Sequence, residues 1–535
     1  MAASAPVEEP PMGFIERGPE GATMHAHSAE AAQGPSPLGK VPASQTLFSA
    51  DGRLLAAVHT AGVSIYDTST HAVLREIPTP GTVAVHFSPT GKYLIVYQKG
   101  NAAGAGDDKN LTVWDARTGA RVYECFQKSF NKVDWPYLQF SADDTIAARV
   151  VTNEAHFIRA ADFAAQPLRL RVPQIAAAKL SPGAQPMLAT FIPEVKGQPC
   201  SVRIYPPPPP DSQGAVELQP AARKSFFRTQ EVEFMWARDG AAVLILGSTD
   251  VDVTNQSYFG ETSLHFMRTD GALDCKVPLD KDGPVHEAAW SPTSEEFVVV
   301  YGFMPAKATI FSAAKCEPKY QLGAGPHNTV RWNPFGRFIC LAGFGNLPGD
   351  MKFFDRKSDG KYKLVGATRA ACSVTAEWSP DGRRLLTATT APRLNVDNGF
   401  KIWRYNGDLL HHAPRDKLYE AKWQPARAGM HADRAISPGS VRKESEEGGA
   451  GTKKPGAYRP PMATSGAGNF SAAKAAPEDT GPGKYRAPGA AAPRGSGATS
   501  GPPGAAFVDS SSSASKNAAK NAKKRAAAKA KKEAE

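Results

Sequence analysis

The sequence contains few cysteines, and their spacing predicts neither disulfides nor a metal site. No two of them form a CxxC pair, and none is combined with histidines at the spacing of a zinc finger. This pattern excludes a disulfide scaffold and favours a reducing compartment. The six cysteines are Cys125, Cys200, Cys275, Cys316, Cys340 and Cys372.

A long apolar run is also missing. Nowhere does an uninterrupted apolar stretch approach the roughly 18 residues that cross a bilayer. The N-terminal segment, MAASAPVEEPPMGFIERG, has acidic residues and prolines where a secretory signal has positive charge followed by apolar residues. We therefore expect a soluble, cytoplasmic protein that is neither exported nor bound to a membrane.

Motifs for catalysis and for nucleotide binding are absent. The sequence has no GxxxxGK[ST] phosphate-binding loop and no GxSxG nucleophile elbow. The string HEAAW places Trp290 where a zinc protease needs its second histidine, so His286 and Glu287 are expected to be strand or loop residues. Asp143 and Asp144 fall in a predicted hairpin turn, where solvated turn chemistry is expected. These absences argue against an enzyme and predict no cofactor and no metal.

Positive charge is distributed very unevenly along the 535 residues. Residues 431–535 contain 18 Lys or Arg and nine Asp or Glu, so they supply +9 of the formal net charge of +11. The remaining chain is then close to neutral. A concentrated block of positive charge attracts polyanions. The charge pattern therefore predicts contact with RNA, the ribosome or an acidic surface.

A short phrase recurs along the chain: an apolar strand ending in a large residue, a Ser-Pro or Ser-Ala-Asp turn with Gly, and a second strand, as in LFSADGRLLAAV and AEWSPDGRRLLTAT. Successive anchors are 39, 53, 40, 56, 54, 42, 46 and 45 residues apart. A four-stranded WD-repeat blade takes about 40 to 45 residues. The nine anchors are Phe48, Phe87, Phe140, Leu180, Trp236, Trp290, Trp332, Trp378 and Trp423.

These repeats predict an all-β fold, a nine-bladed WD-repeat-like β-propeller. The ninth anchor starts a blade that the chain does not complete, so residues 14–28 and the segment after them are predicted to close the ring. The expected organisation is a disordered N-terminus at 1–12, the propeller at 13–427, a disordered linker at 428–515 and a basic segment at 516–535.

The basic segment is built mainly from Ala and Lys, which favour a helix when it is bound. Its cations are dense enough to contact phosphates, although a solvated charge run would look the same. The RNA- or ribosome-binding candidates are Lys516, Lys520, Lys523, Lys524, Arg525, Lys529, Lys531 and Lys532.

Several longer strings resemble the eukaryotic translation initiation factor 2A family. They include KSFFRTQEVEFMW (224–236), EFVVVYGFMPAKATIF (296–311), LAGFGNLPGDMKFFD (341–355) and TATTAPRLNVDNGFKIW (387–403). The resemblance implies a factor that brings initiator methionyl-tRNA to the small ribosomal subunit without a GTPase of its own. It also implies codon control, starts at non-AUG or internal sites, and contacts with mRNA and other initiation factors. We expect the protein to be a monomer. The alternative is a WD-repeat scaffold for proteins that makes no contact with tRNA.

The resemblance also points to candidate contact residues. Two loops match the family's distinctive strings, although Gly and Pro at blade corners more often serve backbone geometry. The loop candidates are Met304, Pro305, Lys307, Gly343, Phe344, Gly345 and Asn346. A further candidate is the short motif around AYRPP in the linker, where no core requires an aromatic residue; its residues are Lys453, Lys454, Tyr458 and Arg459.

Overall fold

The apolar repeat folds into short antiparallel strands, and no helix occurs in the part of the chain that the structure describes. That part, in the computed structural model, is residues 12–27, 35–99, 109–195, 197–249 and 261–434. No helix long and apolar enough to cross a membrane occurs within these ranges.

Nine sheets are formed, and we number the blades from the first sheet that the chain completes without interruption. Blade 1 contains β4 (Gln45–Phe48), β5 (Leu54–His59), β6 (Gly62–Asp67) and β7 (Val73–Ile77). Blade 2 contains β8 (Thr82–Phe87), β9 (Tyr93–Gln98), β10 (Leu111–Asp115) and β11 (Arg121–Cys125). Blade 3 contains β12 (Gln139–Phe140), β13 (Ile146–Val151), β14 (Glu154–Arg159), β15 (Leu168–Arg171) and β19 (Ala215–Val216). Blade 4 contains β16 (Ala177–Leu180), β17 (Leu188–Ile192), β18 (Cys200–Tyr205) and β20 (Ala222–Phe226). Blade 5 contains β21 (Glu231–Trp236), β22 (Ala242–Thr249), β23 (Glu261–Arg268) and β24 (Asp274–Lys276). Blade 6 contains β25 (Val285–Trp290), β26 (Glu296–Tyr301), β27 (Ala306–Ser312) and β28 (Pro318–Gly325). Blade 7 contains β29 (Thr329–Trp332), β30 (Phe338–Ala342), β31 (Asp350–Arg356) and β32 (Tyr362–Arg369). Blade 8 contains β33 (Thr375–Trp378), β34 (Arg384–Thr389), β35 (Gly399–Arg404) and β36 (Leu409–Pro414). Blade 9 contains β37 (Glu420–Trp423), β1 (Met12–Gly18), β2 (Gly21–His27) and β3 (Ser36–Val41).

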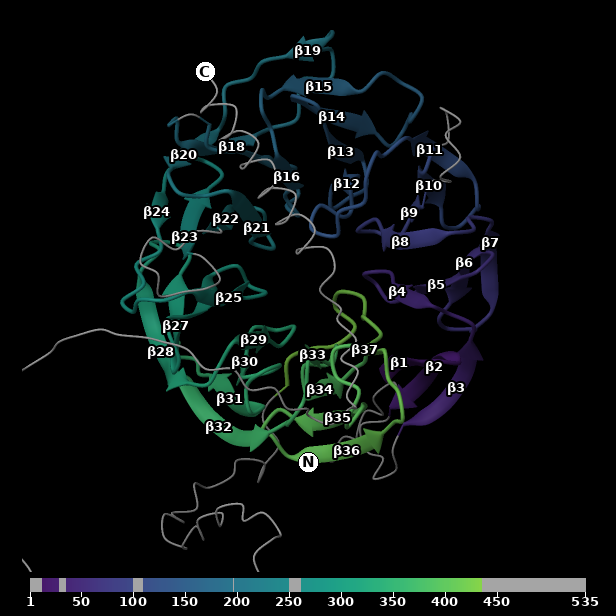
Figure 1. Cartoon of the computed structure of the whole chain (residues 1–535), viewed down its shortest axis with the longest axis vertical. Coiled ribbons are helices and arrows are strands. Elements are labelled where there is room, and N and C mark those ends of the chain that lie inside the picture. Colours follow the sequence, from purple (N-terminus) through teal and green to yellow (C-terminus); the bar gives the residue numbers. More distant parts are fainter. Residues whose placement is uncertain (1–11, 28–34, 100–108, 196, 250–260, 435–535) are drawn as a thin grey trace, which may run out of the picture. The chain divides into compact units, whose positions relative to one another are not determined.

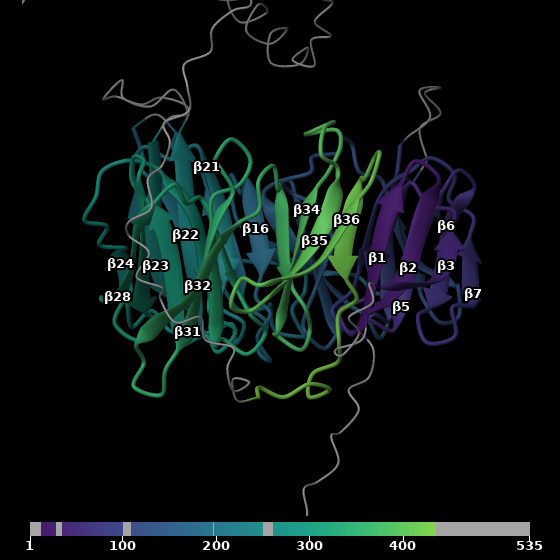
Figure 2. The same cartoon turned by 90° about the horizontal axis from the view of Figure 1, so that it is seen from below.

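The sheets are arranged radially around a centre, with the first strand of each blade inside and the last outside (Figure 1). Seen from the side, the strands run across the thickness of the ring (Figure 2). The predicted all-β, nine-bladed propeller is therefore confirmed. Of the predicted disordered linker at 428–515, residues 435–515 lie outside the described residues, as does the predicted basic segment at 516–535.

Each of the nine anchors predicted from the repeat is the last residue of the inner strand of its blade. From blade 5 onward the anchors are tryptophans, and four of their indoles join neighbouring blades. The indole nitrogen of Trp290 donates to the carbonyl of Met235 (2.8 Å), one residue before the preceding anchor. Trp236, Trp332 and Trp378 repeat this contact with the blade before them. The recurring aromatic thus fixes the packing of one blade on the next.

The turn after the anchor explains the Ser-Pro-Asp-Gly phrase. In blade 8, the Ser379 hydroxyl accepts a hydrogen bond from the Arg384 main-chain N–H (2.9 Å), and the Asp381 carboxylate accepts one from the Arg383 N–H (3.1 Å). Gly382 takes a positive φ of 66°, a conformation that favours glycine. The two strands are therefore held in a tight hairpin by side chains that the phrase specifies.

The N-terminal strands lie in the same sheet as the last strand of the propeller. β1 pairs antiparallel with β37, with Phe14 opposite Trp423 and Arg17 opposite Glu420. The Phe14 and Trp423 rings meet edge-on, 5.7 Å between centroids, and both are fully buried. Blade 9 is therefore built from the two ends of the propeller, which closes the ring without an exposed inner edge.

The two acidic residues of the blade 3 hairpin turn have different environments. Asp143 accepts hydrogen bonds within its own turn from Ser141 (2.6 Å) and is exposed. Asp144 is buried, with a positive φ of 59°, and its carboxylate accepts hydrogen bonds from the hydroxyls of Ser88 (2.5 Å) and Thr90 in blade 2. The expectation of a solvated turn is therefore wrong for Asp144, because this carboxylate joins two blades.

Candidate macromolecule-binding surfaces

The loops of the propeller lie on two faces. The upper face of Figure 2 carries the loops that join the second strand of a blade to the third, and the loops that join one blade to the next. The lower face carries the tight hairpin turns after the anchors and the connections from third to fourth strands. The upper loops vary more in length than the hairpin turns after the anchors, from 19–20 between β1 and β2 to 126–138 between β11 and β12, so they offer more room for recognition.

Exposed apolar side chains concentrate on the upper face. Among the described residues, the four most exposed phenylalanines all lie on its loops: Phe126 (62%), Phe130 (37%), Phe227 (61%) and Phe303 (39%). Large exposed apolar side chains that gather on one face mark contact surfaces. The other members of this set on the same face are Val133, Val195, Met304 and Val396.

The predicted candidates Met304 and Pro305 lie in the loop between β26 and β27, on the upper face, and Lys307 is the second residue of β27. Met304 is 43% exposed, and Pro305 is exposed as well. The Lys307 side chain is held within the protein, because its ammonium pairs with the Asp280 carboxylate. The same carboxylate accepts a hydrogen bond from the Tyr301 hydroxyl (2.6 Å). Within this loop, Met304 and Pro305 are therefore available to a partner, and Lys307 braces the loop.

The candidates Gly343 to Asn346 form the loop between β30 and β31 in the adjacent blade. Phe344 is buried, and its main-chain N–H and carbonyl are both bound by the side chain of Asn328 (2.9 and 3.0 Å). A Cβ on Gly343 would lie 1.8 Å from the carbonyl oxygen of Pro326, so this glycine is required by close packing of backbone. Asn346 is exposed at the tip. Only this last residue presents a side chain to a partner.

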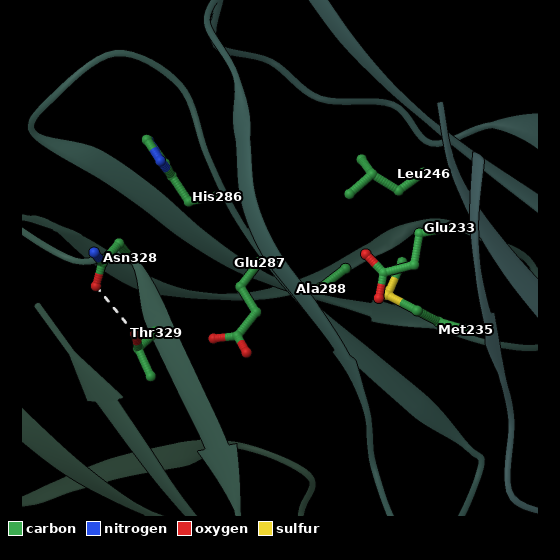
Figure 3. Close-up of a pocket in the computed structure, with 8 residues that line it drawn as sticks. All are labelled: Glu233, Met235, Leu246, His286, Glu287, Ala288, Asn328 and Thr329. Atoms are coloured by element: carbon green, nitrogen blue, oxygen red, sulfur yellow. Dashed lines mark hydrogen bonds between the residues drawn. The ribbon is translucent and has the colours of Figure 1, made fainter. Parts of the chain in front are cut away.

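A cavity of about 330 Å³ lies between blades 5, 6 and 7, lined mainly by the inner strands β21 and β25 and the start of β29 (Figure 3). The Glu287 carboxylate accepts a hydrogen bond from the Val330 N–H (2.7 Å) and pairs with Arg331 (2.5 Å). The Nε2 atom of His286 bonds the carbonyl of Gly302 (2.9 Å). These two ionisable groups serve the packing of strands. Within the described ranges, no group of His, Cys, Asp or Glu is placed to hold a metal ion.

Sequence reasoning did not single out the long loop between β11 and β12, residues 126–138, which follows blade 2. Phe130 stacks on Tyr97 (5.1 Å between centroids) and contacts Trp135 (5.9 Å). The Tyr137 hydroxyl binds the Asn131 main-chain N–H and donates to the carbonyl of Ser129 (3.1 Å). The 53-residue spacing from Phe87 to Phe140 was the available signal, since it exceeds the length of a blade.

The last described segment, 424–434, lies beneath the lower face (Figure 2). Arg337 of blade 7 donates to the carbonyl of Arg434 (2.7 Å) and pairs with Asp433 (3.2 Å). The chain therefore leaves the propeller at its lower face, near blades 7 and 8. The predicted linker motif around Tyr458 and the predicted cations at 516–532 lie outside the described residues.

The fold and its exposed loops define a class of protein: a nine-bladed propeller that presents surfaces to macromolecules. Residues 224–421 match the family described as eukaryotic translation initiation factor eIF2A. The chain is 38% identical over 441 residues to eukaryotic translation initiation factor 2A of Schizosaccharomyces pombe, covering 80% of this chain and 74% of that protein. The chain belongs to the eukaryotic translation initiation factor 2A family.

Two further comparisons agree with this assignment. The factor of the same name from Dictyostelium discoideum is 32% identical over 417 residues, covering 77% of this chain and 66% of that protein. A crystal structure described as that of the eukaryotic initiation factor superposes with a TM-score of 0.68 at 34% identity, covering 78% of this chain and 100% of that one. The chain thus spans about two thirds to three quarters of the length of these two curated relatives.

Proposed function

We propose that this protein binds the small ribosomal subunit and promotes delivery of initiator methionyl-tRNA in a manner that depends on the start codon and not on GTP. The observation that carries the proposal is the family membership, with 38% identity over 441 residues to a translation initiation factor. The sequence contains no GxxxxGK[ST] loop, which fits delivery without a bound nucleotide. Non-AUG and internal starts belong to the same proposal.

In this proposal the protein is a cytoplasmic monomer that performs no catalysis. The propeller is a rigid body whose upper face meets ribosomal proteins, RNA or other initiation factors. The charge of +9 in residues 431–535 contacts RNA phosphates, with mRNA or the tRNA among its partners. Asp433 and Arg434, the last residues that the structure describes, are held by Arg337 at the lower face.

Co-sedimentation of the full chain with purified small subunits over a series of salt concentrations tests the subunit contact. If the C-terminal region neutralises about five phosphates, the log–log salt slope should be near −3.5. A variant truncated after residue 434 should bind more weakly and with a shallower slope. An unchanged slope would remove RNA contact from the C-terminal region, and no co-sedimentation at low salt would contradict the proposal itself.

A protein scaffold without tRNA contact is the second candidate function. The observation that favours it is the set of exposed apolar residues on the upper face, including Phe227, Phe303 and Met304. Such side chains suit a protein interface better than a phosphate backbone. Labelled initiator tRNA separates the two functions, because a scaffold would reach the small subunit without changing how much tRNA is retained there.

A further inference from the structure

The loop between β11 and β12 presents aromatic rings on a braced support. Phe126 is 62% exposed and Phe130 is 37% exposed. Tyr97, Trp135 and Tyr137 pack beneath and beside Phe130, with centroids 5.1 to 6.3 Å from its ring. Because these contacts and the Tyr137 hydroxyl hold the loop, the exposed face of Phe130 needs little ordering when a ligand binds. The Asn110 side chain bonds the main-chain N–H and carbonyl of Gln127, which holds the backbone next to Phe126.

The same loop has a net charge of +1, from Lys128, Lys132 and Asp134. Lys128 and Lys132 are exposed, and neither forms an ion pair with any described residue. Asp134 is the loop's acidic residue, and its carboxylate accepts a hydrogen bond from the Asn131 side chain (2.8 Å). The two ammonium groups therefore alternate with the exposed rings along the sequence Phe126, Lys128, Phe130, Lys132.

We propose that residues 126–137 form a binding site for single-stranded RNA, with bases stacked on Phe126 and Phe130 and phosphates contacted by Lys128 and Lys132. Aromatic faces accept any base, and lysines spaced between them follow the phosphate backbone. The lysines favour RNA over a protein partner, since the core of a protein interface is depleted of lysine and would leave both ammonium groups unpaired. The site lies on the propeller and is separate from the basic C-terminal region.

Binding of the full-length protein to a fluorescently labelled oligouridylate of about ten nucleotides tests the site. Phe126→Ala should weaken binding about fivefold or more, because it removes one stacked base, and it should leave the salt slope unchanged. Lys128→Ala combined with Lys132→Ala should reduce the magnitude of the log–log salt slope by about 1.4, or 0.7 for each phosphate that the variant no longer neutralises. Leu409→Ala is the control, since Leu409 is 51% exposed on the outer strand β36, away from the upper face, and should have no effect.

A second readout separates this site from the C-terminal region in the same full-length protein. Cross-linking of an oligonucleotide that contains 4-thiouridine, followed by mass spectrometry, should recover peptides from residues 126–137. The proposal is overturned if Phe126→Ala and Leu409→Ala bind the oligonucleotide equally well. It is also overturned if Phe126→Ala abolishes capture of a protein partner and leaves RNA affinity unchanged. Neither result depends on initiator tRNA. The RNA site can therefore be confirmed even if delivery of initiator tRNA is not, and delivery can be confirmed even if the RNA site is not.

Discussion

The indole nitrogen of Trp378 donates a hydrogen bond to the main-chain carbonyl of Arg331, 2.9 Å away, and so joins blade 8 to blade 7. Trp423 occupies the equivalent anchor position one blade later, but its indole nitrogen is buried without a hydrogen-bond partner among the described residues. Trp378→Phe should therefore lower the free energy of unfolding by about 1 kcal/mol more than Trp423→Phe. Both changes remove the same atoms, so their difference in chemical denaturation isolates the hydrogen bond. Equal losses would show that ring packing alone sets the role of the anchors.

Closure of the ring by the N-terminal strands is tested by removing them. Deletion of residues 1–40 takes β1 and β2 away from β37 and exposes Trp423 and Phe400, which Phe14 covers, so the melting temperature should fall sharply. Phe14→Ala alone should cost about 3–5 kcal/mol, as for other buried phenylalanines. Phe227→Ala, at an exposed position, serves as the control. A melting temperature unchanged by the deletion would mean that blades 1 to 8 close without these strands.

Substitutions at two residues of the loop at 343–346 can distinguish a role in packing from a role in partner binding. Gly343→Ala places a Cβ against the carbonyl oxygen of Pro326 and should lower the melting temperature. Asn346→Ala changes an exposed side chain and should leave the melting temperature within about 1 °C, because surface substitutions away from special features change stability little. If Asn346 contacts a partner, this variant should bind small subunits more weakly although it is folded normally. Binding equal to the parent protein would assign the whole loop to backbone packing.

Three buried histidines should make the propeller less stable in acid. Burial lowers the pKa of His27, His265 and His327 from 6.5 to about 4. Between these values the unfolded chain binds protons that the folded chain excludes, so the stability present above pH 6.5 is lost as the pH falls toward 4. The loss is at most about 3 kcal/mol per histidine. The melting temperature should be lower at pH 5 than at pH 7.5. His327→Asn should make this difference in melting temperature smaller. A difference unchanged by His327→Asn would show that this histidine does not contribute.

The fold could be predicted because its determinants are local. The Ser-Pro-Asp-Gly turn at 379–382 acts within one hairpin, and the repetition of this turn beside anchors such as Trp378 makes the spacing of the blades visible. Contacts between blades are set by residues far apart in sequence. Asp144 is buried against Ser88, 56 residues away, and the sequence of its own turn does not indicate this burial.

Candidate sites were harder to predict for the same reason. The signature residues Gly343 and Phe344 stand out in the sequence, yet the structure gives them packing roles. The exposed rings at Phe126 and Phe130 lie in a loop without a repeated phrase, so only the excess length between two anchors pointed to it. Exposure, which decides contact, depends on the closed ring and cannot be read from one blade.

A start-codon toeprint with purified small subunits, mRNA, initiator methionyl-tRNA and the full-length protein tests delivery most directly. With GTP omitted, the protein should produce a reverse-transcription stop at the start codon that weakens when the codon is changed to one that does not pair with the anticodon. A stop that appears equally without the protein, or only after GTP is added, would contradict the account.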